Sequence, residues 1–224
     1  MSLKKKKINL NDNDLFNRNH CFFKQYISAK KSKDLLTKAL NDEENFIPRR
    51  MLNSIQRLVT LAEDMDKIRP GKRSLSLFFL ITCIEAVYTL NNSMLTKQTM
   101  IIDFFTRFLS QEEKDFLFDR LAISKEEDDT FFINPVNAEM FALFLVAVRN
   151  NVAHEGDYSS IQFKAKENSC GVIYDVKAKL KKDEGNKELI YQIDFTYQRL
   201  KNLCVKGLIR YVENYYQQTE IDLT

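Results

Sequence analysis

The chain has 224 residues, of which 44% are hydrophobic and 29% are charged, values that exclude disordered, collagen-like and mucin-like proteins. Five glycines and three prolines are too few for a protein of many short strands, so the composition favours long helices. The net charge is +3, which provides no overall attraction to nucleic acid or to an anionic membrane, and any nucleic-acid site has to be local.

The amino-terminal residues 1–20 are rich in lysine and asparagine and contain no apolar signal segment, so we expect a flexible tail there. A single helical domain is expected over residues 21–224. Apolar residues at spacings of three and four predict amphipathic helices over 21–40 and over 48–68, the second ended by Pro70 and Gly71. The four cysteines form no C-x-x-C pair, which is typical of reduced core residues in a cytoplasmic protein.

Residues 74–90 are apolar on nearly every face. The run is shorter than the roughly 20 residues that a bilayer requires and contains Glu85, so we interpret it as a central helix surrounded by other helices. Two further helices are expected over 97–109 and 111–122, because Ser110 and Glu113 form an S-x-x-E capping box between them.

An acidic loop is expected over 125–129, followed by the best-marked helix of the chain. Asn134 is a good N-cap for this helix, Pro135 suits its first turn, and the helix is expected to end at residues 154–156.

After Gly156 the apolar period changes from about 3.6 residues to about 2. Three alternating runs predict a three-stranded antiparallel meander over about 160–195, with turns at Gly171 and Gly185. A last helix is expected over about 196–217. The predicted fold class is therefore mainly α, a helical bundle with a small antiparallel meander inserted before the C-terminal helix.

Most familiar catalytic signatures are absent from the sequence, including a P-loop, G-x-G-x-x-G, H-E-x-x-H and a zinc-binding cysteine pair. With only His20 and His154, a multi-histidine metal centre within one chain is excluded, and no cofactor is expected. The remaining candidate is the segment 149–154, Arg-Asn-Asn-Val-Ala-His.

This segment resembles the R-x4-6-H motif, often with Asn directly after the Arg, of the HEPN superfamily (higher eukaryotes and prokaryotes nucleotide-binding domains). HEPN domains are helical bundles that carry the motif at the end of a long late helix. Several subfamilies also have an acidic residue in an earlier apolar helix, and Glu85 occupies such a position in the apolar run 74–90. The resemblance implies a HEPN-like core over about 74–158, and the meander lies outside the minimal HEPN bundle.

The resemblance implies a metal-independent endoribonuclease with Arg149, Asn150 and His154 in its catalytic site. A base would take the proton of the ribose 2′-hydroxyl, and an acid would protonate the departing 5′-oxygen, which leaves a 2′,3′-cyclic phosphate. One histidine cannot comfortably serve as base and acid, so the resemblance also implies a homodimer with a composite cleft. It further implies a cytoplasmic toxin or phage-defence protein, with an antitoxin or nucleotidyltransferase partner and no membrane.

The spacing of the motif determines how far apart Arg149 and His154 lie around a helix. Five residues along a continuous α-helix place Arg149 and His154 about 140° apart, so we expect the helix to end at or just before His154. Gly156 would then let the chain turn back. In the alternative interpretation, both side chains only stabilise the helix C-terminus. Glu85 either orients Arg149 as its ion-pair partner, or it pairs with another arginine or faces a dimer surface.

The residues that follow the motif offer candidate RNA contacts. Tyr158 either stacks on a base or packs in the protein. The lysines on the polar side of the predicted sheet either follow an RNA backbone or form a solvated face that prevents edge-to-edge pairing. These are Lys164, Lys166, Lys177, Lys179, Lys181 and Lys182. The alternative to a ribonuclease is a non-catalytic HEPN-like module that binds nucleotide or RNA or scaffolds a partner.

Overall fold

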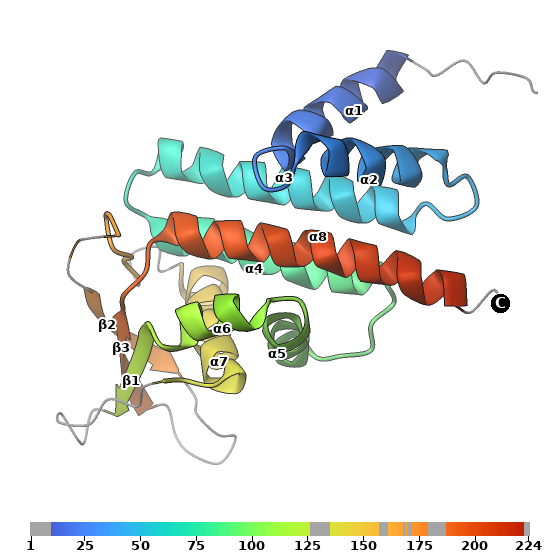
Figure 1. The fold of residues 1–224 in the computed structure, drawn as a ribbon. Helices are drawn as coiled ribbons and strands as arrows, with labels where there is room; N and C mark the ends of the chain where they lie inside the picture. Colours follow the sequence, from blue (N-terminus) through green and yellow to red (C-terminus); the bar gives the residue numbers. More distant parts are fainter. Residues whose placement is uncertain are drawn as a thin grey trace, which may run out of the picture.

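The computed structural model describes residues 10–125, 135–156, 161–167, 169, 172–178 and 187–221. In these ranges the chain forms a bundle of α-helices with a small antiparallel sheet at one end (Figure 1). The predicted mainly α class is therefore confirmed. One continuous hydrophobic cluster links the helices to the sheet.

The first two helices correct the prediction of one helix over 21–40. α1 (Leu10–Phe23) and α2 (Ala29–Asn41) are separate because the Ser28 hydroxyl accepts a hydrogen bond from the Lys31 N–H at 3.2 Å and caps a new helix. The His20 ring and the Ser32 hydroxyl are hydrogen-bonded at 3.0 Å across the turn. The predicted flexible tail is wrong for residues 10–20, which belong to α1, and residues 1–9 lie outside the described residues.

α3 (Ile47–Ile68) and α4 (Arg73–Leu90) confirm the helices predicted over 48–68 and 74–90. By length and composition alone α4 could cross a membrane. In the structure it lies at the centre of the bundle, half buried, and packs against α3, α5, α7 and α8 (Figure 1).

α5 (Lys97–Arg107) and α6 (Gln111–Phe118) flank the predicted capping box, which the structure confirms. The helix predicted over 111–122 ends early, because residues 121–125 form β1 (Leu121–Lys125) instead. In β1, Leu121 pairs with Ile193 and Ile123 with Tyr191, and all four side chains are buried. Pairing with a distant strand has overridden the local helical pattern here.

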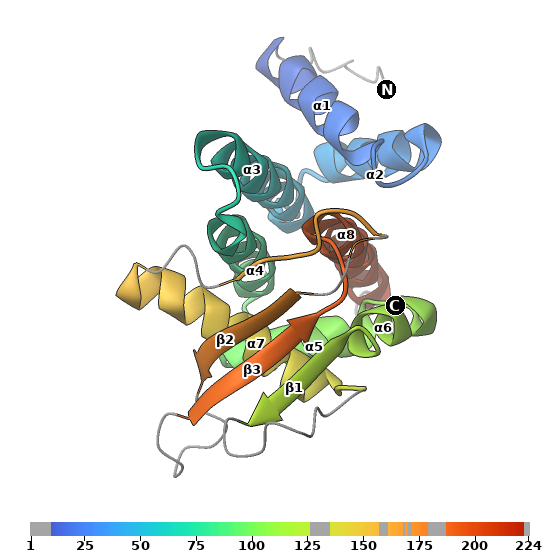
Figure 2. The same cartoon turned by 90° about the vertical axis from the view of Figure 1, so that its left-hand side faces the viewer.

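The sheet has the strand order β1-β3-β2, and both of its pairs are antiparallel. β2 (Val172–Ala178) and β3 (Lys187–Ile193) confirm the last two strands of the predicted meander. The first predicted strand is wrong: between 161 and 166 the chain makes an isolated bridge from Lys164 to Thr196, and β1 takes the third place in the sheet. Gly171 and Gly185 lie outside the described residues. Figure 2 shows α7 running behind the three strands.

α7 (Ala138–Asn150) begins later than predicted. Its N-cap is Asn137 and not Asn134, because the Asn137 side chain accepts a hydrogen bond from the Met140 N–H at 2.8 Å. The expected acidic loop lies outside the described residues beyond Lys125. α8 (Tyr197–Ile221) closes the bundle and ends four residues after the predicted boundary.

Candidate functional site

The helix that carries the motif does not end before His154, contrary to the prediction from the sequence. The chain does not leave the helix before His154 but continues through one π turn, η1 (Asn151–Glu155), whose last bond runs from the Gly156 N–H to the Asn151 carbonyl. A π turn contains more residues than an α turn, so it brings Arg149 and His154 closer in angle than the about 140° of a continuous α-helix. Gly156 then takes the left-handed conformation with φ of 65°, as its predicted role requires.

Arg149 lies against Glu85 of α4, which is one of the two arrangements that the sequence left open for this glutamate. The Arg149 Nη2 is 3.4 Å from the Glu85 Oε2, and the two side chains are only 14% and 12% exposed. The Arg149 Nη1 also donates a hydrogen bond to the Asn150 Oδ1 at 3.1 Å. Contact between α4 and η1 brings the two elements together.

Three polar atoms in this region are buried without a hydrogen-bond partner in the described part of the chain. They are the Glu85 Oε1, the Arg149 Nε and the Thr82 Oγ1. Thr82 lies one turn before Glu85 on α4, so the two side chains project on the same side of the helix. Unpaired buried polar atoms are rare in folded proteins, and their causes include an ordered water, local strain or a functional role. The sequence reasoning missed Thr82, although its i, i+3 spacing to the single acidic residue of an apolar helix was a usable signal.

His154 and Asn150 are exposed, in contrast to Arg149. Within the described residues the His154 imidazole has no hydrogen-bond partner, so either ring nitrogen can exchange protons with a bound molecule. The site therefore combines a nearly buried guanidinium, held by a carboxylate, with an accessible imidazole one turn further along the chain.

Of the predicted lysines, Lys164 and Lys166 have side chains that the structure describes. Lys164 is buried, and its ammonium forms an ion pair with the Asp194 Oδ1 at 2.7 Å. The prediction that Lys164 lies on an exposed sheet face was therefore wrong, because residues 161–166 form no strand. Lys166 is exposed in a turn closed by Ser169. The side chain of Lys177 in β2, and the whole of Tyr158, Lys179, Lys181 and Lys182, lie outside the described residues.

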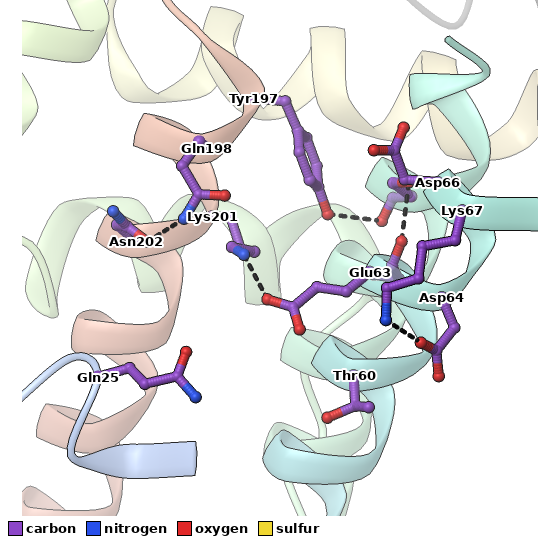
Figure 3. A network of polar contacts seen from close by, with 12 residues as sticks. Gln25, Thr60, Glu63, Asp64, Asp66, Lys67, Tyr197, Gln198, Lys201 and Asn202 are labelled. Atoms are coloured by element: carbon purple, nitrogen blue, oxygen red, sulfur yellow. Dashed lines mark hydrogen bonds and ion pairs between the residues drawn. The ribbon is translucent and has the colours of Figure 1, made fainter. Parts of the chain in front are cut away.

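A second cluster of polar side chains lies between α3 and α8 (Figure 3). The Lys201 ammonium, 6% exposed, forms an ion pair with Glu63. The Tyr197 hydroxyl donates a hydrogen bond to the Ser76 carbonyl at 3.4 Å. Burial and the neighbouring Glu63 charge raise the pKa of Tyr26. These groups satisfy one another, so we interpret the cluster as a cross-link between helices.

No group of three or more His, Cys, Asp or Glu side chains in the described ranges is arranged to hold a metal ion.

Comparison of the chain with protein-family models, with curated proteins and with solved structures found no match.

Proposed function

We propose that the protein is a metal-independent endoribonuclease of the HEPN type, which cleaves RNA by attack of the ribose 2′-hydroxyl on the adjacent phosphate. The observation that carries this proposal is the arrangement at the end of α7. There Arg149 is held by Glu85, and the π turn that follows carries an exposed His154.

Each residue has a chemical role in this proposal. An imidazole nitrogen can accept or donate a proton, so His154 can take the proton of the 2′-hydroxyl or give one to the departing 5′-oxygen. The 2′-oxygen forms a bond to phosphorus, the bond to the 5′-oxygen breaks, and the products are a 2′,3′-cyclic phosphate and a free 5′-hydroxyl. The guanidinium of Arg149 is always charged and stabilises the extra negative charge on the phosphoryl oxygens. Asn150 positions that guanidinium through its Oδ1.

A homodimer is part of the proposal, because each chain has a single histidine at the site. Two chains that meet at the ends of α7 provide one His154 as base and the other as acid.

The cellular role is proposed on the resemblance of residues 149–154 to the HEPN motif. In this role the protein is a cytoplasmic toxin or phage-defence enzyme that an antitoxin or a nucleotidyltransferase restrains.

The proposal is tested by incubating purified protein with mixed RNA in EDTA. Wild type is expected to cleave RNA to cyclic phosphate ends, with a bell-shaped dependence of rate on pH, and to leave DNA intact because DNA has no 2′-hydroxyl. His154→Ala and Arg149→Ala are each expected to lose about two to four orders of magnitude in rate.

The matched control is His20→Ala, which removes the other histidine of the chain from α1 and is expected to leave the rate unchanged. Sedimentation is expected to show a dimer. If wild type and His154→Ala cleave equally, or if neither cleaves, the proposed ribonuclease is wrong and the non-catalytic RNA- or nucleotide-binding module replaces it.

A further inference from the structure

A groove of about 740 Å³ runs between α1 and α3 and reaches the C-terminal end of α4 at Leu90. Three arginines line it, Arg18 from α1 and Arg50 and Arg57 from α3. The volume is within the range of about 300–1,000 Å³ found for small-molecule sites. It is sufficient for a short stretch of a single nucleic-acid strand and too small for a double helix.

The charge of this groove is not balanced within the part of the chain that the structure describes. Arg18, Arg50 and Arg57 are exposed, and none of them has an ion-pair partner among the described residues. The lining contains one carboxylate, Asp64, which is already paired with Lys67 at 2.8 Å. Arginines on other surfaces do find carboxylates: Arg73 pairs with Asp66, Arg120 with Asp194 and Arg210 with Glu113. The groove is therefore a local site of positive charge in a chain whose net charge is only +3.

The spacing of the arginines favours a chain of phosphates over a single small anion. Arg50 and Arg57 are two turns apart on one side of α3, a separation of about 10 Å along the helix axis. Guanidinium groups present forked donors that match phosphate oxygens. Between the two arginines the groove is lined by the Asn53 amide and the Ser54 hydroxyl, which suit the polar edges of a nucleotide.

The groove and the candidate catalytic site both include residues of α4. Leu90 lines the groove, and Glu85, which holds Arg149, is five residues earlier, about 8 Å along the helix axis. α3 packs on α4, and α4 packs on α7 and η1. Figure 2 shows α3, α4 and α7 following one another.

From these observations we infer that the α1–α3 groove binds the sugar-phosphate backbone of single-stranded RNA through Arg18, Arg50 and Arg57. The strand then passes over the C-terminal half of α4 to Arg149 and His154. The choice of RNA rests on the proposed function, whereas the binding of a phosphate chain rests on the groove alone.

The test measures binding by fluorescence anisotropy with a labelled single-stranded RNA of about 20 nucleotides. All variants carry His154→Ala, so that no RNA is cleaved during titration. The double change Arg50→Gln/Arg57→Gln is expected to raise Kd at least tenfold. It should also lower the slope of log K against log salt by about 1.4, because each lost phosphate contact contributes about 0.7 for a single strand.

The matched control is Lys30→Gln/Lys33→Gln, which removes the same charge from two exposed positions on α2. It is expected to change Kd by less than about twofold, since these lysines are outside the groove. Circular dichroism of each variant verifies that the fold is retained. Equal weakening by the two double variants, or no weakening by the groove variant, would overturn the inference. Binding to anionic vesicles is measured for the same proteins. If the groove variant loses vesicle binding and keeps RNA binding, the inference is also overturned and the groove is assigned to a membrane surface.

The outcome for the groove is separable from the outcome for the ribonuclease. With His154 restored, the groove variant is expected to raise KM with little change in kcat. If wild type cleaves no RNA but the groove variant still loses RNA binding, the groove stands and the ribonuclease fails. If cleavage depends on His154 and the groove variant binds and cleaves as wild type does, the ribonuclease stands and the groove is wrong.

Discussion

Arg149 of α7 and Glu85 of α4 hold each other at 3.4 Å, and each also has one buried polar atom without a partner among the described residues. A nearly buried charge that loses its counter-charge is costly, so each of the two side chains fixes the position of the other. Because Arg149 belongs to the motif and Glu85 does not, this ion pair makes Glu85 the positioning residue of the candidate site.

Glu85→Gln is expected to lower kcat at least tenfold with a smaller change in KM, because it removes the charge that orients Arg149 while it preserves the size of the side chain. A double-mutant cycle provides the control: Glu85→Gln should have little further effect on the residual rate of Arg149→Ala. Steady-state kinetics of the four proteins checks this. An equal loss in both backgrounds would mean that Glu85 acts independently of Arg149.

Gly156→Ala is expected to destabilise the protein by about 1–2 kcal/mol, because a Cβ disfavours the left-handed conformation. No atom of the described residues lies within 4 Å of the added Cβ, so the expected cost is that of the backbone conformation. The variant is also expected to slow RNA cleavage, since the chain beside His154 has to rearrange.

Gly71→Ala is the matched control for this change. Gly71 has a φ of 79° and equally open surroundings, but it lies between α3 and α4, away from the motif. Denaturant unfolding should show a similar loss of stability in both variants, and only Gly156→Ala should lose activity. Equal loss of activity in the two variants would show that stability alone is limiting.

Glu113 is expected to make the stability of the fold dependent on pH. Partial burial alone would raise the pKa of this carboxylate, but hydrogen bonds from the Arg210 guanidinium, at 2.9 Å to Oε1, and from the Ser110 N–H outweigh burial and hold the pKa below its usual range. The stabilisation is then present above the unfolded pKa of about 4.3 and is lost as the pH falls through the lower folded value.

Urea unfolding of wild type and Glu113→Gln at several pH values checks this dependence. Glu113→Gln should be less stable by about 1–2 kcal/mol at pH 7, and the two curves should converge as the pH falls from about 5 to 3. Glu112→Gln, an exposed change in the same helical turn, is the control and should show a difference near zero. A constant difference down to pH 3 would contradict the ionic origin.

Gly207 of α8 lies against the Phe104 side chain of α5. A Cβ at this position would lie 2.7 Å from the ring of Phe104, which is fully buried and cannot move aside cheaply. Gly207→Ala is therefore expected to lower the free energy of unfolding by about 1–3 kcal/mol, although alanine alone would favour the helix by about 1 kcal/mol. Denaturant unfolding measures this change in the free energy of unfolding, and Lys206→Ala is the control. A Gly207→Ala protein as stable as wild type would show that the two helices have room to separate.

The sequence by itself determined the elements whose signals are local. The helices over 48–68 and 74–90, the capping box of Ser110 and Glu113, and the left-handed Gly156 each depend on residues within one or two turns of chain, so their patterns could be read directly. The same holds for the paired strands β2 and β3, which are close in sequence and alternate clearly.

Only the tertiary structure decided the features that join distant segments. β1 is a strand because β3 pairs with it, and Lys164 is buried because Asp194 supplies its counter-charge. The choice of Arg149 as the partner of Glu85 was likewise one of several that the sequence allowed, and the α1–α3 groove has no sequence signal at all. Periodicity reports how one segment divides between core and solvent, whereas pairing and charge compensation depend on which segments meet when the chain is folded.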